Sequence, residues 1–277
     1  MNKRIGMVLL LLGLLSTATS QAGAAQLIMS APPRESRIEG ERLYGPLARH
    51  LAKITGQSVR YRHPGNWFKY QRDMRRGKYD IVLDGPQFVS WRRLHLQHEV
   101  LVRLPGQLEY YLLAKKEDGS VNALHDLARK RICAIAPPDL SILTVLDRYR
   151  NPVRQPVLVE IKDDMAKVYQ AFTQGKCRAV VLSTGFYRKG MTQAQRDASK
   201  ILFHSKPRPN LALSVSPKLD AKARQKIIRS LTSRDGAEGS KAILKRFAGE
   251  SVRSFVPAKG SEYDRHHELL EGVVFGW

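Results

Sequence analysis

Asp84-Gly85-Pro86 could bring a small anion or an amine against the start of a helix. An apolar run, Tyr79–Leu83, precedes these residues and predicts a strand, and a helix is expected from Pro86 onward. Gly85 permits a tight turn, and Pro86 suits the first helical position because the N–H that it lacks has no intrahelical partner there. Backbone amides at a helix start can bind an anion, whereas the Asp84 carboxylate could bind a ligand amine or cap the helix. The pattern predicts binding of a small solute.

Five further residues could contribute to such a site. Gln87 lies in the first turn of the same helix and could direct its amide at a ligand. Trp67 and Tyr70 are three residues apart on another predicted helix and could wall a cleft, although core packing explains them as well. Ser183 and Thr184 end a predicted strand, where ligands of α/β proteins bind, but they also suit the entry to a helix.

Catalytic and metal-binding patterns are missing from the sequence. We find no G-x-S-x-G, no H-E-x-x-H and no glycine-rich phosphate loop with a lysine. His266 and His267 are adjacent and would not share a helix face, so we predict no metal site there. We expect a binding protein without a cofactor, not an enzyme.

The first 25 residues predict a cleavable signal peptide. Lys3 and Arg4 precede the apolar run Met7–Leu15, and small residues follow at Ala22-Gly23-Ala24. The run is too short to cross a membrane, and no later stretch approaches the roughly 18 apolar residues that a membrane span needs. We therefore expect an exported protein that is not membrane-embedded, most simply in a periplasm.

The chain is strongly basic, with a formal net charge of +22. Removal of residues 1–25 lowers the charge to +20, because they contain two cations and no acid. Such a charge would ordinarily suggest nucleic acid as a partner, but export argues against it. An anionic ligand, an anionic envelope surface, or simply solvated basic helix faces are the alternatives.

Two cysteines are an even pair in an oxidising compartment. Cys133 and Cys177 fall in two different predicted strands, so they could form a disulfide if those strands are neighbours. Two buried thiols are the alternative, and the pair alone is too few for a metal centre.

Strands and helices alternate along the chain, which predicts mainly parallel sheets flanked by helices. The expected strands are 26–30, 58–62, 79–83, 108–116, 131–136, 157–161, 177–183 and 211–216, and the expected helices are 41–54, 67–76, 86 onward, 122–128, 141–150, 164–174, 221–232 and 239–247. Two lobes follow, one from residues 26–106 and 211–277 and one from 107–210, with extended crossings near 105–111 and 205–212. Ligands favour the cleft between two such lobes.

Several motifs, taken in order, resemble phosphate/phosphonate-type substrate-binding proteins of ABC importers. The similarity covers about residues 26–250. The motifs are Pro46-Leu-Ala-x-x-Leu51 with Thr55-Gly56, Tyr79-Asp80-Ile with Gly85-Pro86-x-x-Val89, Gly106 with Tyr110, Ala123-Leu-x-Asp-Leu127, His204-Ser-x-Pro-x-Pro209-Asn210 and Ser216-Pro-x-Leu-Asp220.

The resemblance implies the two-lobed type 2 periplasmic-binding fold, whose lobes close over a small anionic, phosphate- or phosphonate-like ligand for an ABC permease. It also implies that Tyr110, rather than Tyr111 on the opposite face of the strand, faces the cleft, and that a helix start in the second lobe holds the ligand's oxyanion. Ser141 is the hydroxyl that remains at that turn, where the chain has lost the family's glycine. A periplasmic sensory or adaptor module for a membrane signalling partner is the alternative function.

Overall fold

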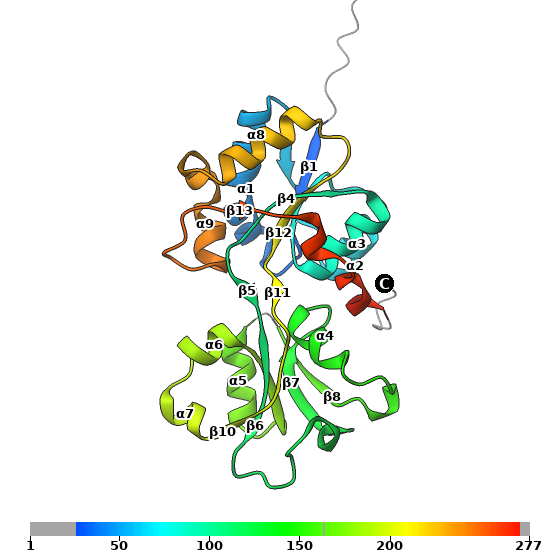
Figure 1. The fold of residues 1–277 in the computed structure, drawn as a ribbon, viewed down its shortest axis with the longest axis vertical. Helices are drawn as coiled ribbons and strands as arrows, with labels where there is room; N and C mark the ends of the chain where they lie inside the picture. The colour runs from blue at the N-terminus through cyan, green and yellow to red at the C-terminus, as the bar shows by residue number, and fades with distance from the viewer. Residues whose placement is uncertain (1–25, 163, 272–277) are drawn as a thin grey trace, which may run out of the picture.

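The computed structural model describes residues 26–162 and 164–271, and the predicted signal peptide lies outside them. Figure 1 shows two α/β lobes stacked along the long axis of the molecule and joined by a narrow region. Two short strands make this junction, β5 (Gln107–Leu108) and β11 (Arg208–Pro209), which pair antiparallel. Both expected crossings are thereby confirmed.

One lobe, the six-stranded lobe, is built on a sheet with helices on both faces. Its strands, in spatial order, are β13 (Val256–Pro257), β4 (Glu99–Arg103), β12 (Ala212–Val215), β3 (Ile81–Asp84), β1 (Leu27–Ser30) and β2 (Val59–Tyr61). Its helices are α1 (Arg37–Thr55), α2 (Trp67–Arg75), α3 (Pro86–Leu96), α8 (Ala221–Leu231), the short η3 (Arg234–Gly236) and α9 (Ala237–Phe247). Ile81 and Leu83 pack on the side of α1, α8 and α9, whereas Val82 packs on the side of α2 and α3. Because successive side chains of a strand alternate between faces, burial of both faces explains the continuous apolar run in β3.

The other lobe, the five-stranded lobe, has the same layered construction. Its strands, in spatial order, are β10 (Ser199–His204), β6 (Tyr110–Lys115), β9 (Ala179–Ser183), β7 (Arg131–Ile135) and β8 (Val157–Ile161). Its helices are η1 (Leu124–Leu127), α4 (Leu140–Leu146), η2 (Pro152–Arg154), α5 (Met165–Thr173), α6 (Thr184–Lys189) and α7 (Gln193–Asp197). Ile132 packs toward α4 on one face, and the adjacent Cys133 packs toward α5 on the other.

The sheets are mixed, so the expectation of mainly parallel sheets is wrong. β1 pairs parallel with β2 and β3, and β7 pairs parallel with β8 and β9, as βαβ connections require. By contrast, β12 is antiparallel to β3 and β4, and β6 is antiparallel to β9 and β10. Strands β6 and β12 each enter their sheet from a crossing between the lobes, not from a helical crossover, and so run in the opposite direction.

A third segment also links the lobes near the C-terminus. After β13 the chain forms η4 (Gly260–Tyr263) and η5 (His266–Leu270), and η5 contacts both α3 and α4. The Tyr263 hydroxyl donates to the Asn210 carbonyl at 2.7 Å, and Leu269 and Leu270 join the apolar cluster around α4. This end of the chain therefore packs on both lobes.

Cys133 and Cys177 form a disulfide, which settles the two alternatives left open by the sequence. Their Cα atoms are 5.7 Å apart, and both residues are buried. The bond joins β7 to the residue two positions before β9, and these two strands are hydrogen-bonded neighbours. It therefore fixes the centre of the five-stranded lobe.

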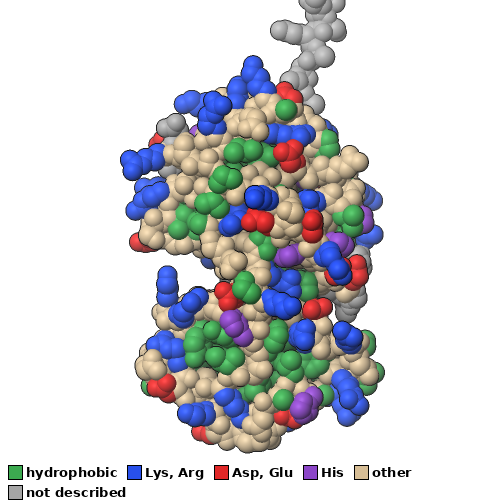
Figure 2. All heavy atoms as spheres, viewed as in Figure 1, with side chains coloured by type: hydrophobic (Ala, Val, Ile, Leu, Met, Phe, Trp, Pro, Cys, Tyr) green, Lys and Arg blue, Asp and Glu red, His purple; other side chains and the backbone are tan. Residues whose placement is uncertain are grey.

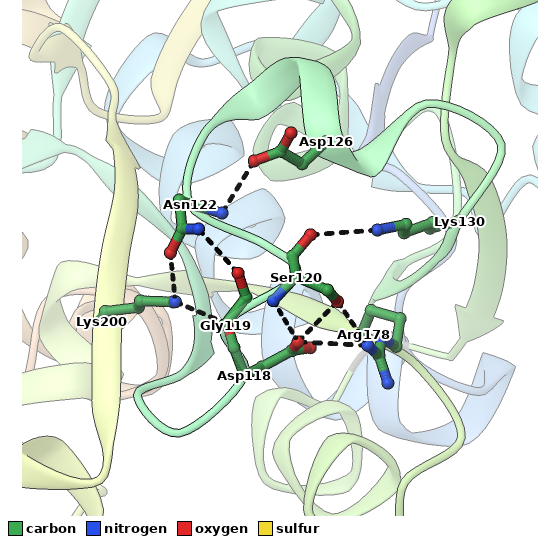
Figure 3. Close-up of polar contacts among 8 residues, drawn as sticks. All are labelled: Asp118, Gly119, Ser120, Asn122, Asp126, Lys130, Arg178 and Lys200. Atoms are coloured by element: carbon green, nitrogen blue, oxygen red, sulfur yellow. Dashed lines mark hydrogen bonds and ion pairs between the residues drawn. The ribbon is translucent and has the colours of Figure 1, made fainter.

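A polar cluster fastens the loop between β6 and η1 (Figure 3). The Asp118 carboxylate accepts from the Ser120 hydroxyl at 2.7 Å and from Arg178 Nη2 at 3.1 Å. Lys200 of β10 donates to the Asp118 carbonyl at 2.7 Å and to Asn122 Oδ1 at 2.8 Å. Because these charged groups contact one another, we assign the cluster a structural role in holding the loop.

Candidate functional site

Asp84 lies at the end of β3 and forms a buried ion pair. Its Oδ2 accepts from Arg92 Nη1 at 2.7 Å and from the Tyr70 hydroxyl, and its Oδ1 accepts from the Gly85 N–H at 2.7 Å. The side chains of Asp84 and Arg92 are 0% and 1% exposed, so water does not screen the pair. Gly85, not Asp84, is the N-cap residue of α3, so the capping alternative is wrong.

The pKa values of its partners follow from this burial. Burial raises the pKa of the Tyr70 phenol well above its ordinary value, which keeps the hydroxyl protonated as a donor. Burial alone would lower the pKa of Arg92, but Tyr70 and Asp84 outweigh it, and the pKa is raised. Arg92 thus stays charged and ties α3 to the end of β3.

Trp67 and Tyr70 belong to an aromatic cluster on the α2 and α3 side. The Trp67 ring stacks on Phe88 with centroids 6.0 Å apart, and the Tyr70 ring stacks on Tyr79 at 5.7 Å. Tyr70 is fully buried, as core packing predicts, whereas Trp67 is half-buried and carries the Arg34 guanidinium 5.9 Å from its ring centroid. Trp67 therefore contacts both the aromatic core and a cation.

Arg34 is a candidate that the sequence analysis missed. Its Nη1 is buried and has no hydrogen-bond partner among the described residues. Burial lowers its pKa, but Asp139 of the other lobe and Asp84 oppose this effect, and the pKa is raised. The available signal was its position just beyond the carboxyl end of β1, the kind of sheet edge where Asp84 was recognised.

Tyr110 and Ser141 approach this region from the five-stranded lobe. Burial raises the pKa of the Tyr110 phenol, Asp139 adds to this effect, and Arg34 and Arg208 oppose it. Arg34 of the six-stranded lobe, Asp139 of the five-stranded lobe and Arg208 of the crossing therefore all lie near Tyr110. Asp139 caps α4, and its Oδ1 accepts from the Ser141 N–H at 2.9 Å and from the Ser141 hydroxyl at 2.6 Å. The two Ser141 donors predicted to hold an oxyanion therefore donate to a carboxylate of the chain itself.

Gln87 makes a direct hydrogen bond between the lobes. Its Nε2 donates to the Pro138 carbonyl, in the turn before α4, at 3.1 Å. The Gln87 side chain is fully buried, and the neighbouring Phe88 belongs to the same apolar cluster as Leu140 of α4. The Gln87 bond therefore brings the start of α3 into contact with the turn before α4, which belongs to the other lobe.

Ser183 and Thr184 have local roles at the start of α6. Ser183 caps this helix by accepting from the Phe186 N–H at 3.1 Å, and the Thr184 hydroxyl accepts from Arg188 Nη2 at 3.3 Å. Among the described residues no hydrogen bond joins either hydroxyl to Arg34. The structure thus favours their helix-entry role, and their contact with a ligand stays a prediction.

Within residues 26–162 and 164–271, no set of three or more His, Cys, Asp or Glu residues is placed to hold a metal ion. His266 Nδ1 lies 2.9 Å from the Asp264 carbonyl oxygen, and His267 Nδ1 lies 3.0 Å from the Ser90 hydroxyl, so the two imidazoles have different partners. Within the same described residues, no helix is both long and apolar enough to cross a membrane.

Two α/β lobes joined by crossing strands, with charged and aromatic residues of both lobes meeting between them, define a two-lobed solute-binding protein. The family model described as "ABC transporter, phosphonate, periplasmic substrate-binding protein" matches residues 29–263, and the chain belongs to this family. The protein is thus a periplasmic solute-binding component of an ABC transporter, and its function is binding, not catalysis.

Solved structures agree on the fold. XAC2383 from Xanthomonas citri bound to ATP matches with a TM-score of 0.68 and 13% identity, covering 89% of this chain and 96% of that one. PhnD1 from Prochlorococcus marinus in complex with methylphosphonate matches at 0.63 and 12%, covering 88% and 96%. A binding-protein component of an ABC phosphonate transporter from Pseudomonas aeruginosa matches at 0.59 and 14%, covering 87% and 83%. A search of curated proteins found no match.

Proposed function

We propose that the protein binds a small solute with an anionic oxygen between its lobes and delivers it to an ABC permease. The observation that carries this proposal is Arg34, whose buried Nη1 has no partner among the described residues. A buried guanidinium nitrogen without an acceptor is costly, and an anionic ligand oxygen would supply a charge-assisted hydrogen bond. Trp67 and Tyr110 would bound the ligand from the two lobes.

Arg92, the fully buried arginine of this region, is already paired. Asp84 neutralises Arg92 within the six-stranded lobe. Arg34 has no such pair, although the more distant Asp139 and Asp84 raise its pKa. Two similar structures are bound to methylphosphonate and to ATP, and each of these ligands presents phosphorus oxyanions. These ligands support phosphonate- or phosphate-like solutes as the first to test here.

Ligand binding would be tested by thermal shift and calorimetry with phosphate, phosphite, methylphosphonate, sulfate and small carboxylates. A ligand at about 100 times its Kd should stabilise the native state by about 2.7 kcal/mol. We expect Arg34→Met to weaken that binding by at least about tenfold, since a charged hydrogen bond contributes roughly 1.5–3 kcal/mol. Arg37→Met is the matched control, because Arg37 is exposed in the first turn of α1.

Two results would reject the anion site. One is the lack of a shift with every anion at millimolar concentration, and the other is equal binding by the Arg34→Met and wild-type proteins. Transport is tested separately, in cells that lack the gene. Loss of uptake of the identified ligand supports delivery to a permease, whereas intact uptake with an altered signalling response would favour the sensory alternative.

The proposal includes export of the protein by a cleavable signal peptide and the lobe boundaries predicted from the sequence. Cleavage after the predicted signal peptide, residues 1–25, would be read by N-terminal sequencing of the protein from the periplasm. The division into residues 26–106 with 211–277, and 107–210, is supported by the two separate sheets. Limited proteolysis that cuts first near the crossings would agree with it.

A further inference from the structure

A basic groove lies between α1, α8 and α9, on the six-stranded lobe. Its volume is about 810 Å³. The residues that line it are Pro46, Arg49, His50, Lys53, Ile54, Lys226, Arg229, Ser230, Ser233, Glu238 and Gly239. Figure 1 places α8 at the end of this lobe away from the crossings β5 and β11, and Figure 2 shows Lys and Arg side chains gathered along the same rim. The groove is therefore separate from the region around Arg34.

Two basic strips flank the groove. Arg49 and Lys53 are four residues apart on α1, and Lys226 and Arg229 are three residues apart on α8, so each pair lies on one helix face. Helices α1 and α8 pack together, and His50 Nε2 lies 2.7 Å from the Ser230 hydroxyl between them. The packing thus brings four cations to one cavity.

None of these four cations forms an ion pair or hydrogen bond with any other described residue, although basic residues nearby do. Arg224 of α8 pairs with Glu99, and Arg246 of α9 pairs with Glu35 at 3.7 Å. Glu238 is the one acidic residue in the lining described above, and it has no ion pair with the strips. The cations of the groove are therefore available to a ligand.

Helix dipoles explain only part of this arrangement. Lys53 and Arg229 lie in the last turns of their helices, where a cation is favourable. Arg49 and Lys226 lie earlier, and their proximity to like charges is unfavourable without an anion. A multivalent anion in the groove would remove that repulsion.

We propose that this groove is a second site of the protein, which binds phosphate groups of a polyanionic ligand. A phosphate carries up to two charges and several acceptor oxygens, which suits lysine and arginine side chains on both walls. The cavity is much larger than a single phosphate, so it would accept a diphosphate or the headgroup of an anionic phospholipid. Both sources share the chemistry that the groove recognises.

The proposal is tested with two probes, pyrophosphate in solution and vesicles that contain phosphatidylglycerol. Binding is measured by calorimetry and by vesicle sedimentation in about 0.1 M salt, where distant surface charges are largely screened. The groove variant carries Arg49→Gln, Lys53→Gln, Lys226→Gln and Arg229→Gln. Since each basic residue near an anionic surface contributes about 1 kcal/mol, we expect a loss on the order of a hundredfold or more.

A matched control removes the same charge elsewhere, through Arg42→Gln, Arg60→Gln, Lys176→Gln and Lys222→Gln. All four residues are exposed and none lines the groove. We expect the control to bind as wild type does, and Arg34→Met also to retain binding, because the two sites are independent. Circular dichroism melting of each variant verifies that it is folded.

Binding of either probe that the groove variant alone loses supports the proposal, and the probe identifies the source of the phosphate. The proposal is overturned if wild type binds neither probe, if the control loses as much affinity as the groove variant, or if Arg34→Met abolishes binding. This last result would place the phosphate between the lobes.

Discussion

The Asp84–Arg92 ion pair should be a major contributor to the stability of the six-stranded lobe. Arg92→Met removes the donors to Asp84 Oδ2 and to the Tyr70 hydroxyl but retains an unbranched, flexible side chain in place of the arginine stem. Asp84 then remains buried with a charge and only two donors, the Gly85 N–H and the Tyr70 hydroxyl. Removal of one partner of a buried pair typically costs about 3–5 kcal/mol. We expect about 3 kcal/mol, since two donors persist.

The measurement is urea unfolding at neutral pH, read as a change in midpoint at constant m-value. Asp84→Leu should be similarly destabilising, because it leaves the Arg92 guanidinium buried and unpaired. The double variant should cost about 2 kcal/mol less than the sum of the two single variants, since no uncompensated charge remains.

Arg93→Met is the matched control on the same helix. Arg93 pairs with Asp264, whose side chain is 58% exposed, so its loss should cost no more than about 1 kcal/mol. The reasoning fails if Arg92→Met costs as little as this control, or if the Asp84 and Arg92 effects are simply additive.

Two further predictions concern the disulfide and a buried histidine. The sequence separation of 44 between Cys133 and Cys177 gives the disulfide a loop-entropy contribution of about 4 kcal/mol to stability. Replacement of both cysteines by Ala should therefore lower the free energy of unfolding, measured in urea, by about 4 kcal/mol. A loss below about 1 kcal/mol would contradict this reasoning. Burial lowers the pKa of His98 to about 3, so between about pH 6.5 and 3 only the unfolded state gains a proton at this residue. The free energy of unfolding should therefore decrease as the pH is lowered through this range, by up to about 1.4 kcal/mol per pH unit. His98→Gln should reduce that slope in urea unfolding at several pH values, unlike His125→Gln at an 84% exposed position, and an unchanged slope would disprove the assignment.

Much of the fold was predictable because its signals are local. The predicted strand 157–161 is β8 (Val157–Ile161), and the predicted helix 67–76 is α2 (Trp67–Arg75). The predicted start of α1 at residue 41 was four residues late, since the apolar spacing begins inside the helix. Ser36 and Glu39 form the capping box that starts the helix. This pattern consists of polar residues, so a prediction based on the spacing of apolar residues does not detect it.

Strands whose pairing depends on distant partners were harder to predict. β10 (Ser199–His204) is an edge strand whose apolar run, residues 201–203, is only three residues long, and it forms against β6, more than 80 residues away. The direction of β12 was also non-local, because it depends on the crossing β11. Alternation of strands and helices indicates the α/β class but not the direction of a strand that returns from another lobe.

Charged residues of the candidate site were also hard to predict when their role depends on a partner elsewhere in the fold. Asp84 and Gln87 could be found because they lie at a recognisable strand-to-helix turn. Arg92 could not, since it is one of two consecutive arginines in a strongly basic chain, and only the folded position of Asp84 explains its burial. A buried arginine is identified by its partner, which periodicity does not reveal.

Asp84 and Asp139 change what the two facing helix starts can do. Asp84 accepts the Gly85 N–H before α3, and Asp139 accepts the Ser141 N–H within α4, so a carboxylate already receives a donor at each start. A ligand oxyanion at either start would meet that negative charge at close range, which in a region of low dielectric is a large penalty. Arg34 Nη1 has no such competitor as a direct partner. If the ligand is an anion, its affinity should therefore depend more on Arg34 than on the helix amides, and Ser141→Ala should weaken binding much less than Arg34→Met.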